Sequence, residues 1–533
     1  MKKRVVIAGA GLSGLALALE LAKTDKYEVI VVEKAPQAGG NTSSWTSFKD
    51  PENPGVVQYP MHMYFPFYLN LERIMEESET WDNLSQWISK WEFVDNYDKR
   101  ITFGNTNLSE KLPAPLHALD IFLRLKGLSL RDKLSFTKMF FAAMAFGEDD
   151  EPNFSDRYNF YGLAKKLGVS DKGVDFVDIF TYSITNLPDS WQNGRKFLQL
   201  FYLTILKDRN AMRYSLLTDD YSPGMIEPLV STLKDLGVQF LFQNELLDIY
   251  LDSNDAVKEI RLRDHSLERE RVCKNCGLLF NDSSHTIVCP KCGINEKNLD
   301  FQYDYSPKFL ATDIFVSALQ PHQLIKVILK NSESPLLKHD YFRNLNYYRG
   351  SSLTVSRLWL KDKVESENVI WGQSRRISPS NGMMDISRLM PKYAQGGSVI
   401  DTLSDFDEYH KTLSDEDLKL YLQGGVKNIF PDMVAVDKHI VAKIYPDALY
   451  HRPFPDMYRF KPKSQQTPIN NFLIAGDWSG PYNLGMESAV VSGIKAANEI
   501  IQKDGYQIVP LLHSPPEKMV KFFQHFKFLF RKI

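Results

Sequence analysis

Residues 4–14, RVVIAGAGLSG, decide the fold of this chain. An apolar run of strand length ends in the spacing Gly9-x-Gly11-x-x-Gly14, and the following LALALELAK carries apolar side chains at helical spacing. Gly9 permits the tight turn, Gly11 lets the backbone approach a pyrophosphate, and Gly14 lets the helix pack closely on the strand. The phosphates of a dinucleotide then lie at the helix N-terminus. A glycine-rich turn also has purely structural uses, so the surrounding sequence must decide whether this turn binds a dinucleotide.

That context is a second strand, predicted over residues 27–32, which ends in Glu33 about 20 residues beyond the glycine pattern. A carboxylate at this position accepts the ribose hydroxyls of an adenine dinucleotide and disfavours a 2′-phosphate. The alternative is a solvated charge at the end of a strand. Taken together, the elements predict a dinucleotide-binding α/β domain of the Rossmann type.

The stretch VVEKAPQAGG, residues 31–40, makes a family resemblance specific. Together with GAGLSG it resembles the opening of the FAD-dependent amine-oxidase and phytoene-desaturase superfamily. That superfamily usually has Arg or Lys after the glycine pair, whereas this chain has Asn41 after Gly39 and Gly40. One cationic contact to the flavin pyrophosphate is therefore missing.

Residues 471–478, NFLIAGDW, form an apolar strand that ends in Gly476 and Asp477, after which Gly485 and Met486 open a second helix. This pattern resembles the second FAD motif of the same superfamily. The resemblance implies that Asp477 contacts the ribityl or pyrophosphate portion of FAD, and that the backbone near Met486 faces the isoalloxazine ring. The predicted FAD-binding residues are Gly9, Gly11, Leu12, Ser13, Gly14, Glu33, Lys34, Gly39, Gly40, Asn41, Gly476, Asp477, Gly485 and Met486.

Residues 58–77 indicate a branch of the superfamily. His62, Phe65, Tyr68 and Asn70 fall on the pattern of plant-type phytoene and ζ-carotene desaturases, although the family's glycines around this histidine are not kept. The resemblance implies an FAD-dependent oxidoreductase that removes two hydrogens from adjacent carbons of an apolar isoprenoid or carotenoid-type substrate, with a quinone as electron acceptor. One hydrogen leaves as a hydride to the flavin and the other as a proton. His62 is a candidate proton acceptor, but a histidine among aromatic side chains is also commonly a packed structural residue.

Other activities stay open at this point. The chain contains no compact catalytic motif such as GxSxG or HExxH, which fits chemistry carried by a cofactor. An oxygen-using amine oxidase acting on a polar substrate would keep both FAD motifs, and so would a redox-neutral isomerase. A third alternative is a membrane-attached flavoprotein scaffold that binds a partner through a metal ribbon.

All four cysteines lie in CKNCGLLFNDSSHTIVCPKCG, residues 273–293. The pairs Cys273-x2-Cys276 and Cys289-x2-Cys292 predict four thiolates around one ion in a closed tetrahedral site, which indicates structural zinc. Iron in a rubredoxin-like site is the alternative, because cysteine spacing does not separate these metals. Thiolates that hold a metal indicate a reducing cytoplasm rather than two disulfides. The protein partner of such a ribbon is unknown.

Two segments predict contact with a membrane surface. No apolar run is long enough for a spanning helix, and the basic, apolar start of the chain is interpreted as a strand rather than a signal peptide. Residues 116–146 carry basic side chains among long apolar stretches, and the tail 515–533 has the pattern of a basic amphipathic helix. The apolar residues that share one face of this helix are Met519, Phe522, Phe523, Phe526, Leu529, Phe530 and Ile533. A helix docked on the protein's own core, or on a partner, has the same signature. The predicted location is cytoplasmic and peripherally membrane-associated.

The charge balance, 64 basic against 66 acidic residues, provides no global field for nucleic acid, so no nucleic-acid partner is predicted. We predict a two-domain α/β flavoprotein, with a Rossmann-like FAD-binding domain and a substrate domain of helices and a mixed sheet. The FAD-binding domain is expected over residues 1–60, 215–263, 305–335 and 440–505. The membrane-facing substrate domain is expected over residues 61–214 and 336–439, the inserted metal ribbon over 264–304, and the amphipathic C-terminal helix over 515–533.

Overall fold

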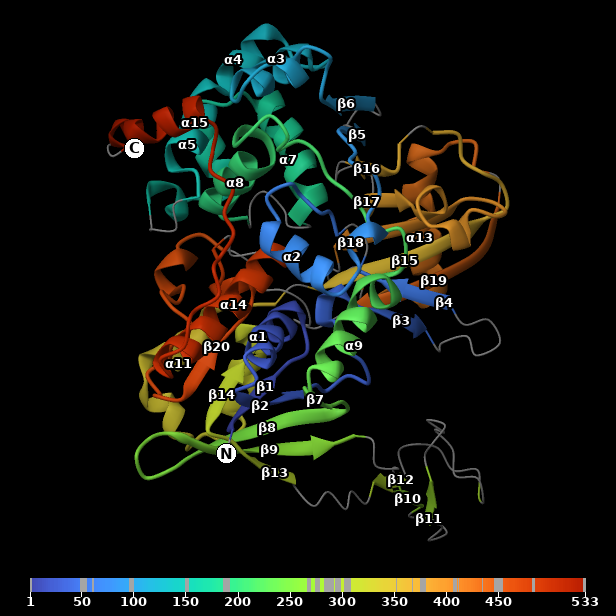
Figure 1. The fold of residues 1–533 in the computed structure, drawn as a ribbon. Helices are drawn as coiled ribbons and strands as arrows, with labels where there is room; N and C mark the ends of the chain where they lie inside the picture. Colours follow the sequence, from blue (N-terminus) through green and yellow to red (C-terminus); the bar gives the residue numbers. More distant parts are fainter. Residues whose placement is uncertain are drawn as a thin grey trace.

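Figure 1 shows the fold of the protein in a computed structural model. The residues that it describes are 2–47, 55–59, 62–94, 100–148, 153–185, 192–265, 270–273, 279–281, 292, 299–301, 308–350, 352–366, 368–373, 380–405, 410, 412–433, 435–444, 454–481 and 485–530.

A five-stranded parallel sheet forms the first domain, and its strand order is β20-β14-β1-β2-β7. Val5, Val6 and Ile7 have no solvent exposure, because layers cover both faces of the sheet and the strand is a continuous apolar run. The strands come from distant parts of the chain, so this domain is assembled from discontinuous segments. Their bounds are β1 Lys3–Ala8, β2 Tyr27–Val32, β7 Gln239–Leu241, β14 Ile314–Ser317 and β20 Phe472–Ile474.

Helices cover one face of this sheet, and a small antiparallel sheet with further helices covers the other (Figure 1). On the first face, α1 (Leu12–Lys23) packs on α14 (Met486–Lys503) and α9 (Glu227–Asp235). The elements on the second face are β8 Asn244–Leu251, β9 Val257–Asp264, β13 Lys308–Ala311, α10 Pro321–Leu329 and α11 Asp340–Asn344.

The second domain combines a seven-stranded mixed sheet with a group of helices. Its strand order is β19-β15-β18-β17-β16-β5-β6, and it is mixed because β16 and β5 pair in parallel while the other pairs are antiparallel. The strand bounds are β5 Lys90–Val94, β6 Arg100–Gly104, β15 Leu353–Leu360, β16 Ile370–Gln373, β17 Ser380–Asp385, β18 Val399–Asp405 and β19 Val436–Ile444. The helices of this domain are α3 Leu116–Arg124, α4 Leu130–Ser135, α5 Thr137–Phe146, α6 Phe160–Lys166, α7 Asp171–Thr185, α8 Gly194–Phe201 and α13 Asp415–Ile429.

Two of the domain boundaries expected from the sequence need correction. The last FAD-binding segment was expected to start at residue 440, but that position falls inside β19, which pairs with β15 in the second sheet. The substrate domain was expected to resume at residue 336, but α11 lies in the core of the first domain, where Phe342 contacts Phe472. The sequence does not show on which sheet these two elements pack. The residues of β19 alternate as in any half-buried strand, and α11 is too short to have a distinctive pattern.

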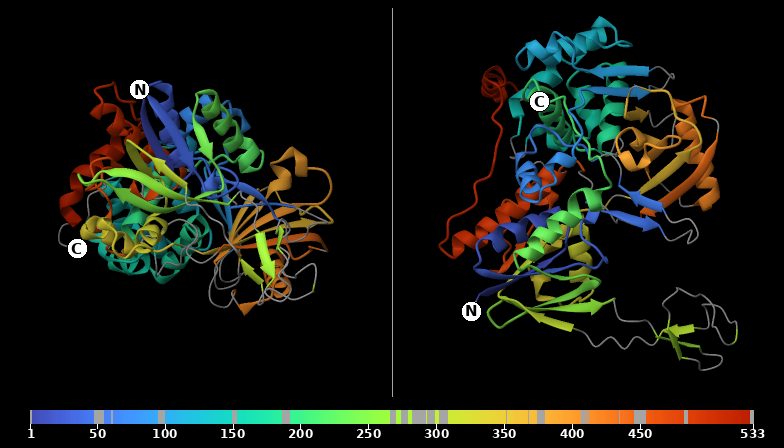
Figure 2. Two further views of the ribbon diagram at one scale, coloured as in Figure 1. Left: turned by 90° about the horizontal axis from the view of Figure 1, so that it is seen from below. Right: turned by 45° about the vertical axis from the view of Figure 1, so that its right-hand side comes forward.

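The chain after α14 runs as an extended strap over residues 504–517, from the first domain to the helices of the second (Figure 2). It crosses α2 (Leu69–Glu77), where the backbone of Leu512 exchanges two hydrogen bonds of 2.9 Å with the amide of Asn70. Glu517 then accepts hydrogen bonds from the backbone N–H groups of Ala114 and Arg209.

The predicted C-terminal helix over 515–533 is shorter and more irregular than expected. It consists of α15 (Lys518–Phe523) followed by a 3-10 segment (Gln524–Phe530). Val520 and Phe530 are buried in the helical core, whereas Phe522 and Leu529 are exposed. The tail therefore has apolar side chains on both sides, and the predicted single apolar face was wrong.

The cysteine-rich insertion contains a small antiparallel sheet of its own, with order β11-β10-β12 (β10 Glu270–Cys273, β11 Leu279–Asn281, β12 Leu299–Phe301). This sheet interrupts the connection between β9 and β13 and lies to one side of the first domain (Figure 2). Cys276 and Cys289 lie outside the described residues, so the predicted metal site also lies outside them. Within the described part of the chain no group of three or more potential metal ligands comes together.

Candidate active site

One cavity of about 760 Å³ lies at the carboxyl ends of β1, β2, β14 and β20. This edge is where ligands bind in open parallel α/β sheets. The cavity continues from the glycine turn of the first domain to aromatic side chains and helix α8 of the second domain. It is therefore shared by segments from both ends of the sequence.

The turn after β1 opens a helix N-terminus onto this cavity. Gly9 has φ +110°, and its N–H donates to Val32 O at 2.8 Å. A Cβ atom on Gly14 would stand 2.1 Å from Gly9 O, so only glycine lets α1 start this close to the strand. Gly11 precedes α1 without any side-chain cap, which leaves the first N–H groups of the helix for an anion.

Glu33 is held rigidly at the end of β2. Its Oε2 accepts a hydrogen bond from the N–H of Ala10, and its Oε1 accepts one from the N–H of Ala35, both at 2.8 Å. Burial raises the pKa of Glu33, while these backbone donors act in the opposite direction. Glu33 lines the cavity, and each of its oxygens can accept a further hydrogen bond, as the recognition of ribose hydroxyls requires.

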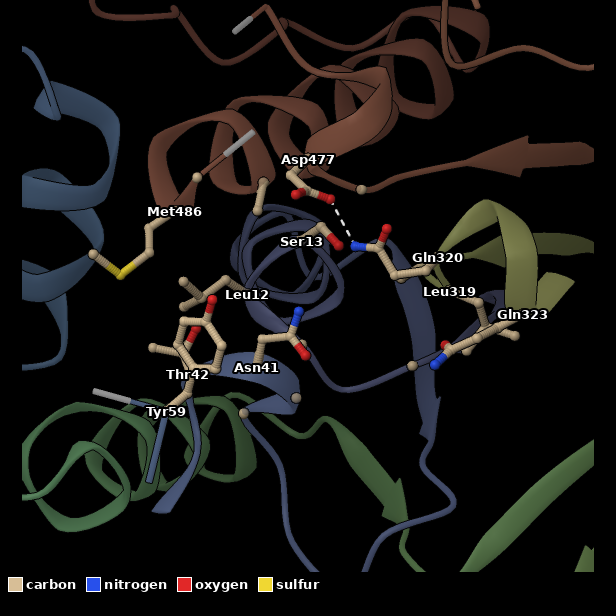
Figure 3. A pocket seen from close by; sticks show the side chains of 18 of the residues that line it. Leu12, Ser13, Asn41, Thr42, Tyr59, Leu319, Gln320, Gln323, Asp477 and Met486 are labelled. Carbon is tan, nitrogen blue, oxygen red and sulfur yellow. Dashed lines mark hydrogen bonds between the residues drawn. The ribbon is translucent and has the colours of Figure 1, made fainter. Parts of the chain in front are cut away.

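A second helix N-terminus opens onto the cavity where α14 begins, because Gly485 precedes Met486 without a side-chain cap. Close by, Asp477 accepts a hydrogen bond of 2.7 Å from Gln320 Nε2 (Figure 3). Burial raises the pKa of Asp477, and the positive charge of Lys196 counteracts this rise. Two uncapped helix N-termini on one elongated cavity suit a molecule with a pyrophosphate in its middle and a ring that becomes anionic.

The end of the cavity far from Glu33 is apolar and aromatic. Its lining there consists of Trp45, Tyr59, His62, Met63, Phe65, Phe67, Tyr68, Leu200 and Leu203. Side chains of this kind suit an aromatic ring system beside an apolar substrate.

His62 is fixed in this aromatic end. Its Nδ1 lies 3.2 Å from Tyr59 O, and since a carbonyl only accepts, Nδ1 carries the proton and Nε2 is an acceptor. The ring packs edge-on against Tyr221 at 4.8 Å. Burial lowers the pKa of His62 to about 4, so its imidazole is neutral near pH 7.

All of the FAD-binding residues predicted from the sequence, with the exception of Gly14, line this one cavity. Gly14 instead makes the close helix–strand contact described above. Asn41 lines the cavity where the superfamily has a cation, and the cations around the cavity come from elsewhere in the chain. They are Lys34, Lys196, Lys326 and Lys330.

Two parts of the site, α8 and the segment from Leu319 to Lys330, were not predicted from the sequence. The second of these could have been found, because residues 313–329 read as a strand followed by a helix, and parallel strands end at the same edge of a sheet. Asn193 could have been recognised as the N-cap of α8, but nothing local to the sequence indicates that Lys196 faces the cavity.

Comparisons with known proteins support this architecture. Residues 7–78 match the model of the NAD(P)-binding Rossmann-like domain, and residues 308–501 match that of the flavin containing amine oxidoreductases. The 15-cis-phytoene desaturase of Synechococcus elongatus is 22% identical over 509 residues, covering 94% of this chain and 96% of the relative. The zeta-carotene desaturase of Synechocystis is 22% identical over 533 residues, covering 93% and 97%.

Solved structures of the same fold include putrescine oxidase, with a TM-score of 0.63 at 12% identity, covering 94% of this chain and 99% of that one. A putative protoporphyrinogen oxidase from Exiguobacterium has a TM-score of 0.59 at 14% identity, with the same coverage. The fold and the cavity define the class as a dinucleotide-binding flavoprotein. With the matches above, the chain is an FAD-dependent oxidoreductase that carries a domain of the flavin-containing amine oxidoreductase type.

Proposed function

We propose that this protein desaturates an apolar isoprenoid of carotenoid type by removing two hydrogens from adjacent carbons. The observation that carries the proposal is the aromatic, apolar end of the cavity, which is continuous with the dinucleotide groove. Similarity to phytoene and zeta-carotene desaturases over more than nine-tenths of the chain supports the same substrate class. When bound, FAD supplies the hydride acceptor for such a reaction.

The protein's part in this reaction is to hold an apolar chain in a dry aromatic cavity and to receive a proton. We propose His62 Nε2 as the proton acceptor, since the hydrogen bond from Nδ1 to Tyr59 O fixes the tautomer that leaves Nε2 free to accept. Its lowered pKa makes it a weak base. Once one substrate carbon has lost a hydride, the proton on the carbon next to it becomes strongly acidic. A weak base is then sufficient to accept that proton.

The experiment is anaerobic mixing of the purified flavoprotein with a panel of isoprenoid hydrocarbons and a panel of primary amines. We expect flavin absorbance to bleach with a hydrocarbon and not with an amine, and a quinone to restore the absorbance. Bleaching by an amine, with fast reoxidation by oxygen and release of peroxide, would replace this proposal by the amine-oxidase alternative. Turnover of a polyene without any bleaching would indicate the isomerase.

We further propose that the protein takes its substrate from a membrane surface at the end formed by α3, α4, α5 and α15. Large apolar side chains are exposed there, namely Leu116, Leu119, Leu123, Leu130, Leu134, Phe141, Met519, Phe522, Phe528 and Leu529. Exposed basic side chains lie among them, including Lys126, Arg131, Lys138 and Lys518. These helices lie together at one end of the molecule (Figure 1). None of the helices in the described ranges is long and apolar enough to span a bilayer.

For the cysteine-rich insertion we propose a structural zinc site. Support comes from its three-stranded antiparallel sheet and the sequence: Cys273 of the first CxxC pair is the last residue of β10, and the second pair lies between β11 and β12 in the sequence. Elemental analysis is expected to give one zinc per chain. Since this sheet pairs only with itself among the described strands, chelation should remove the metal and leave the flavin spectrum unchanged. Iron in place of zinc would favour the rubredoxin-like alternative.

A further inference from the structure

Tyr68 places a phenol hydroxyl beside the start of α14. A Cβ atom on Gly485 would stand 3.2 Å from the Tyr68 hydroxyl oxygen, so the lack of a side chain at Gly485, whose φ is +96°, leaves room for this group. The ring is pinned edge-on by Phe67 at 4.9 Å and by Phe65 at 5.6 Å. Tyr68 also lines the cavity with Met486.

A clamp between two helices fixes this placement. Tyr68 immediately precedes α2, and Gly485 immediately precedes α14. The buried carboxylate of Glu487 accepts hydrogen bonds from the backbone N–H groups of Asn70 and Leu71, at 3.1 and 2.9 Å, and from the Asn70 side-chain amide at 2.7 Å. The starts of α2 and α14 are therefore tied together, which fixes the backbone of Tyr68 relative to the α14 N-terminus.

The hydroxyl is available as a donor. Among the described residues it makes no hydrogen bond to the protein, although its ring lines the cavity. Burial and the negative charge of Glu487 raise the pKa of Tyr68, so the phenol keeps its proton at any physiological pH. It therefore serves as a hydrogen-bond donor and not as a base.

We propose that the Tyr68 hydroxyl donates a hydrogen bond to the polar edge of the isoalloxazine ring and thereby favours the reduced flavin. Glu33 and the α1 N-terminus occupy the adenosine and pyrophosphate end, so the ring belongs at the end where Met486 and the aromatic side chains lie. Reduction adds negative charge to the ring, and a donor at a helix N-terminus stabilises that charge. Tyr68 is thus a positioning and tuning residue. The inference rests on FAD binding and not on the class of substrate.

The test compares Tyr68→Phe with Tyr64→Phe, a buried tyrosine that does not line the cavity and whose hydroxyl donates to Met225 Sδ. Both variants keep the ring and lose one hydroxyl. We expect Tyr68→Phe to retain FAD and to shift the equilibrium between reduced and oxidised flavin about tenfold toward the oxidised form, the effect of one hydrogen bond to a charged group. This corresponds to a midpoint potential about 30 mV more negative. Tyr64→Phe should leave the potential unchanged.

The midpoint potential is read from the flavin absorbance during titration with a reductant, with no substrate present. If Tyr68→Phe purifies without cofactor, the dissociation constants of added oxidised and reduced FAD give the same tenfold ratio. An unchanged potential or ratio in Tyr68→Phe, or an equal shift in Tyr64→Phe, would overturn the inference. Such a failure would leave the desaturase proposal standing, because the substrate panel tests that proposal separately.

Discussion

Gly493 of α14 lies directly against the backbone of Ser13 in α1. A Cβ atom on Gly493 would stand 2.3 Å from Ser13 O and 3.0 Å from the backbone nitrogen of Leu17. The two helices therefore approach more closely than any side chain at residue 493 permits. Ser13 lines the cavity, so the same contact sets the distance between the two helix N-termini on which the cofactor depends.

Gly493→Ala is expected to push α14 away from α1, because the obstructing atoms are backbone and cannot move aside. Overpacking of this kind costs about 1–3 kcal/mol of unfolding free energy. We expect a lower thermal midpoint and a lower FAD content, measured as the ratio of flavin to protein absorbance. The matched control is Gly424→Ala in α13, where a Cβ meets nothing within 4 Å and stability should stay the same or rise slightly. Equal losses in both variants would refute the close-contact argument.

Arg357 joins the two domains through a buried ion cluster. It contacts both carboxylate oxygens of its neighbour across the sheet, Asp401, at 2.6 and 2.8 Å, and Asp220 Oδ1 at 3.1 Å. Asp220 lies in the segment that leads into α9 of the first domain. Arg357→Met should lower the unfolding free energy by about 3–5 kcal/mol, because the buried Asp401 loses its cationic partner and Asp220 keeps only Lys392 and Tyr393. Urea titration measures this loss.

The control for the cluster replaces its three buried charges and leaves Lys392, which is partly exposed and also pairs with Asp219. Arg357→Met combined with Asp220→Asn and Asp401→Asn leaves no unpaired buried charge, so most of the lost stability should return. A triple variant as unstable as Arg357→Met alone would show that side-chain packing, and not charge, dominates at this position.

The pH dependence of stability should report on His62. Its pKa is about 4 in the folded protein, below the ordinary value of 6.5. As the pH falls from 6.5 toward 4, the unfolded chain binds a proton that the folded protein does not, so stability falls in this window. His62→Gln removes this contribution. Between pH 7 and pH 5, the unfolding free energy of the wild type should therefore fall by about 1–2 kcal/mol more than that of the variant.

His117 and His439 have pKa values lowered to about 4 and about 3, so they give the same trend in both proteins. The difference between wild type and His62→Gln therefore isolates His62. Parallel pH profiles for the two proteins would mean that His62 titrates near its ordinary pKa, in contact with water. Such a result would also remove the reason for regarding it as a weak base.

Binding to vesicles should depend on the exposed apolar end of the molecule. Four of its side chains, Leu130, Leu134, Phe522 and Leu529, are each more than half exposed. Replacing all four by Ser is expected to weaken partitioning into vesicles of phosphatidylcholine and an anionic phospholipid at least 100-fold, since each side chain contributes about 1 kcal/mol or more on burial. Co-sedimentation measures the effect.

The control is Leu420→Ser on α13, which removes a similarly exposed leucine far from α4 and α15. It should bind vesicles like the wild type. If the fourfold variant also binds like the wild type, membrane contact involves another surface. If the wild type does not bind vesicles at all, the proposal that this end contacts a membrane is wrong.

Local chemistry explains what the sequence could predict. The turns around Gly9 and Gly485 require glycine, and each lies between an apolar strand and a helix, so both halves of the cofactor site can be recognised without tertiary information. Lys196 could not be recognised, because the face that a short helix presents depends on its neighbours. The prediction for the C-terminal tail was wrong for a related reason. Val520 and Phe522 are both apolar, and only the packing of the tail on α5 decides that Val520 is the buried one.

The pairing of α1 with α14 also constrains how the chain is made. The strand β1 and helix α1 leave the ribosome long before three of their partners, β14, β20 and α14, which lie in the second half of the sequence. Until α14 has been made, the face of α1 that packs on α14 stays uncovered, although β2 and α9 can already cover other parts of the helix. A nascent chain without α14 lacks one of the two helix N-termini on the cavity, so we expect it to bind FAD weakly and to expose the uncovered face of α1 to chaperones and proteases. We therefore expect FAD to bind stably only after α14 has been synthesised.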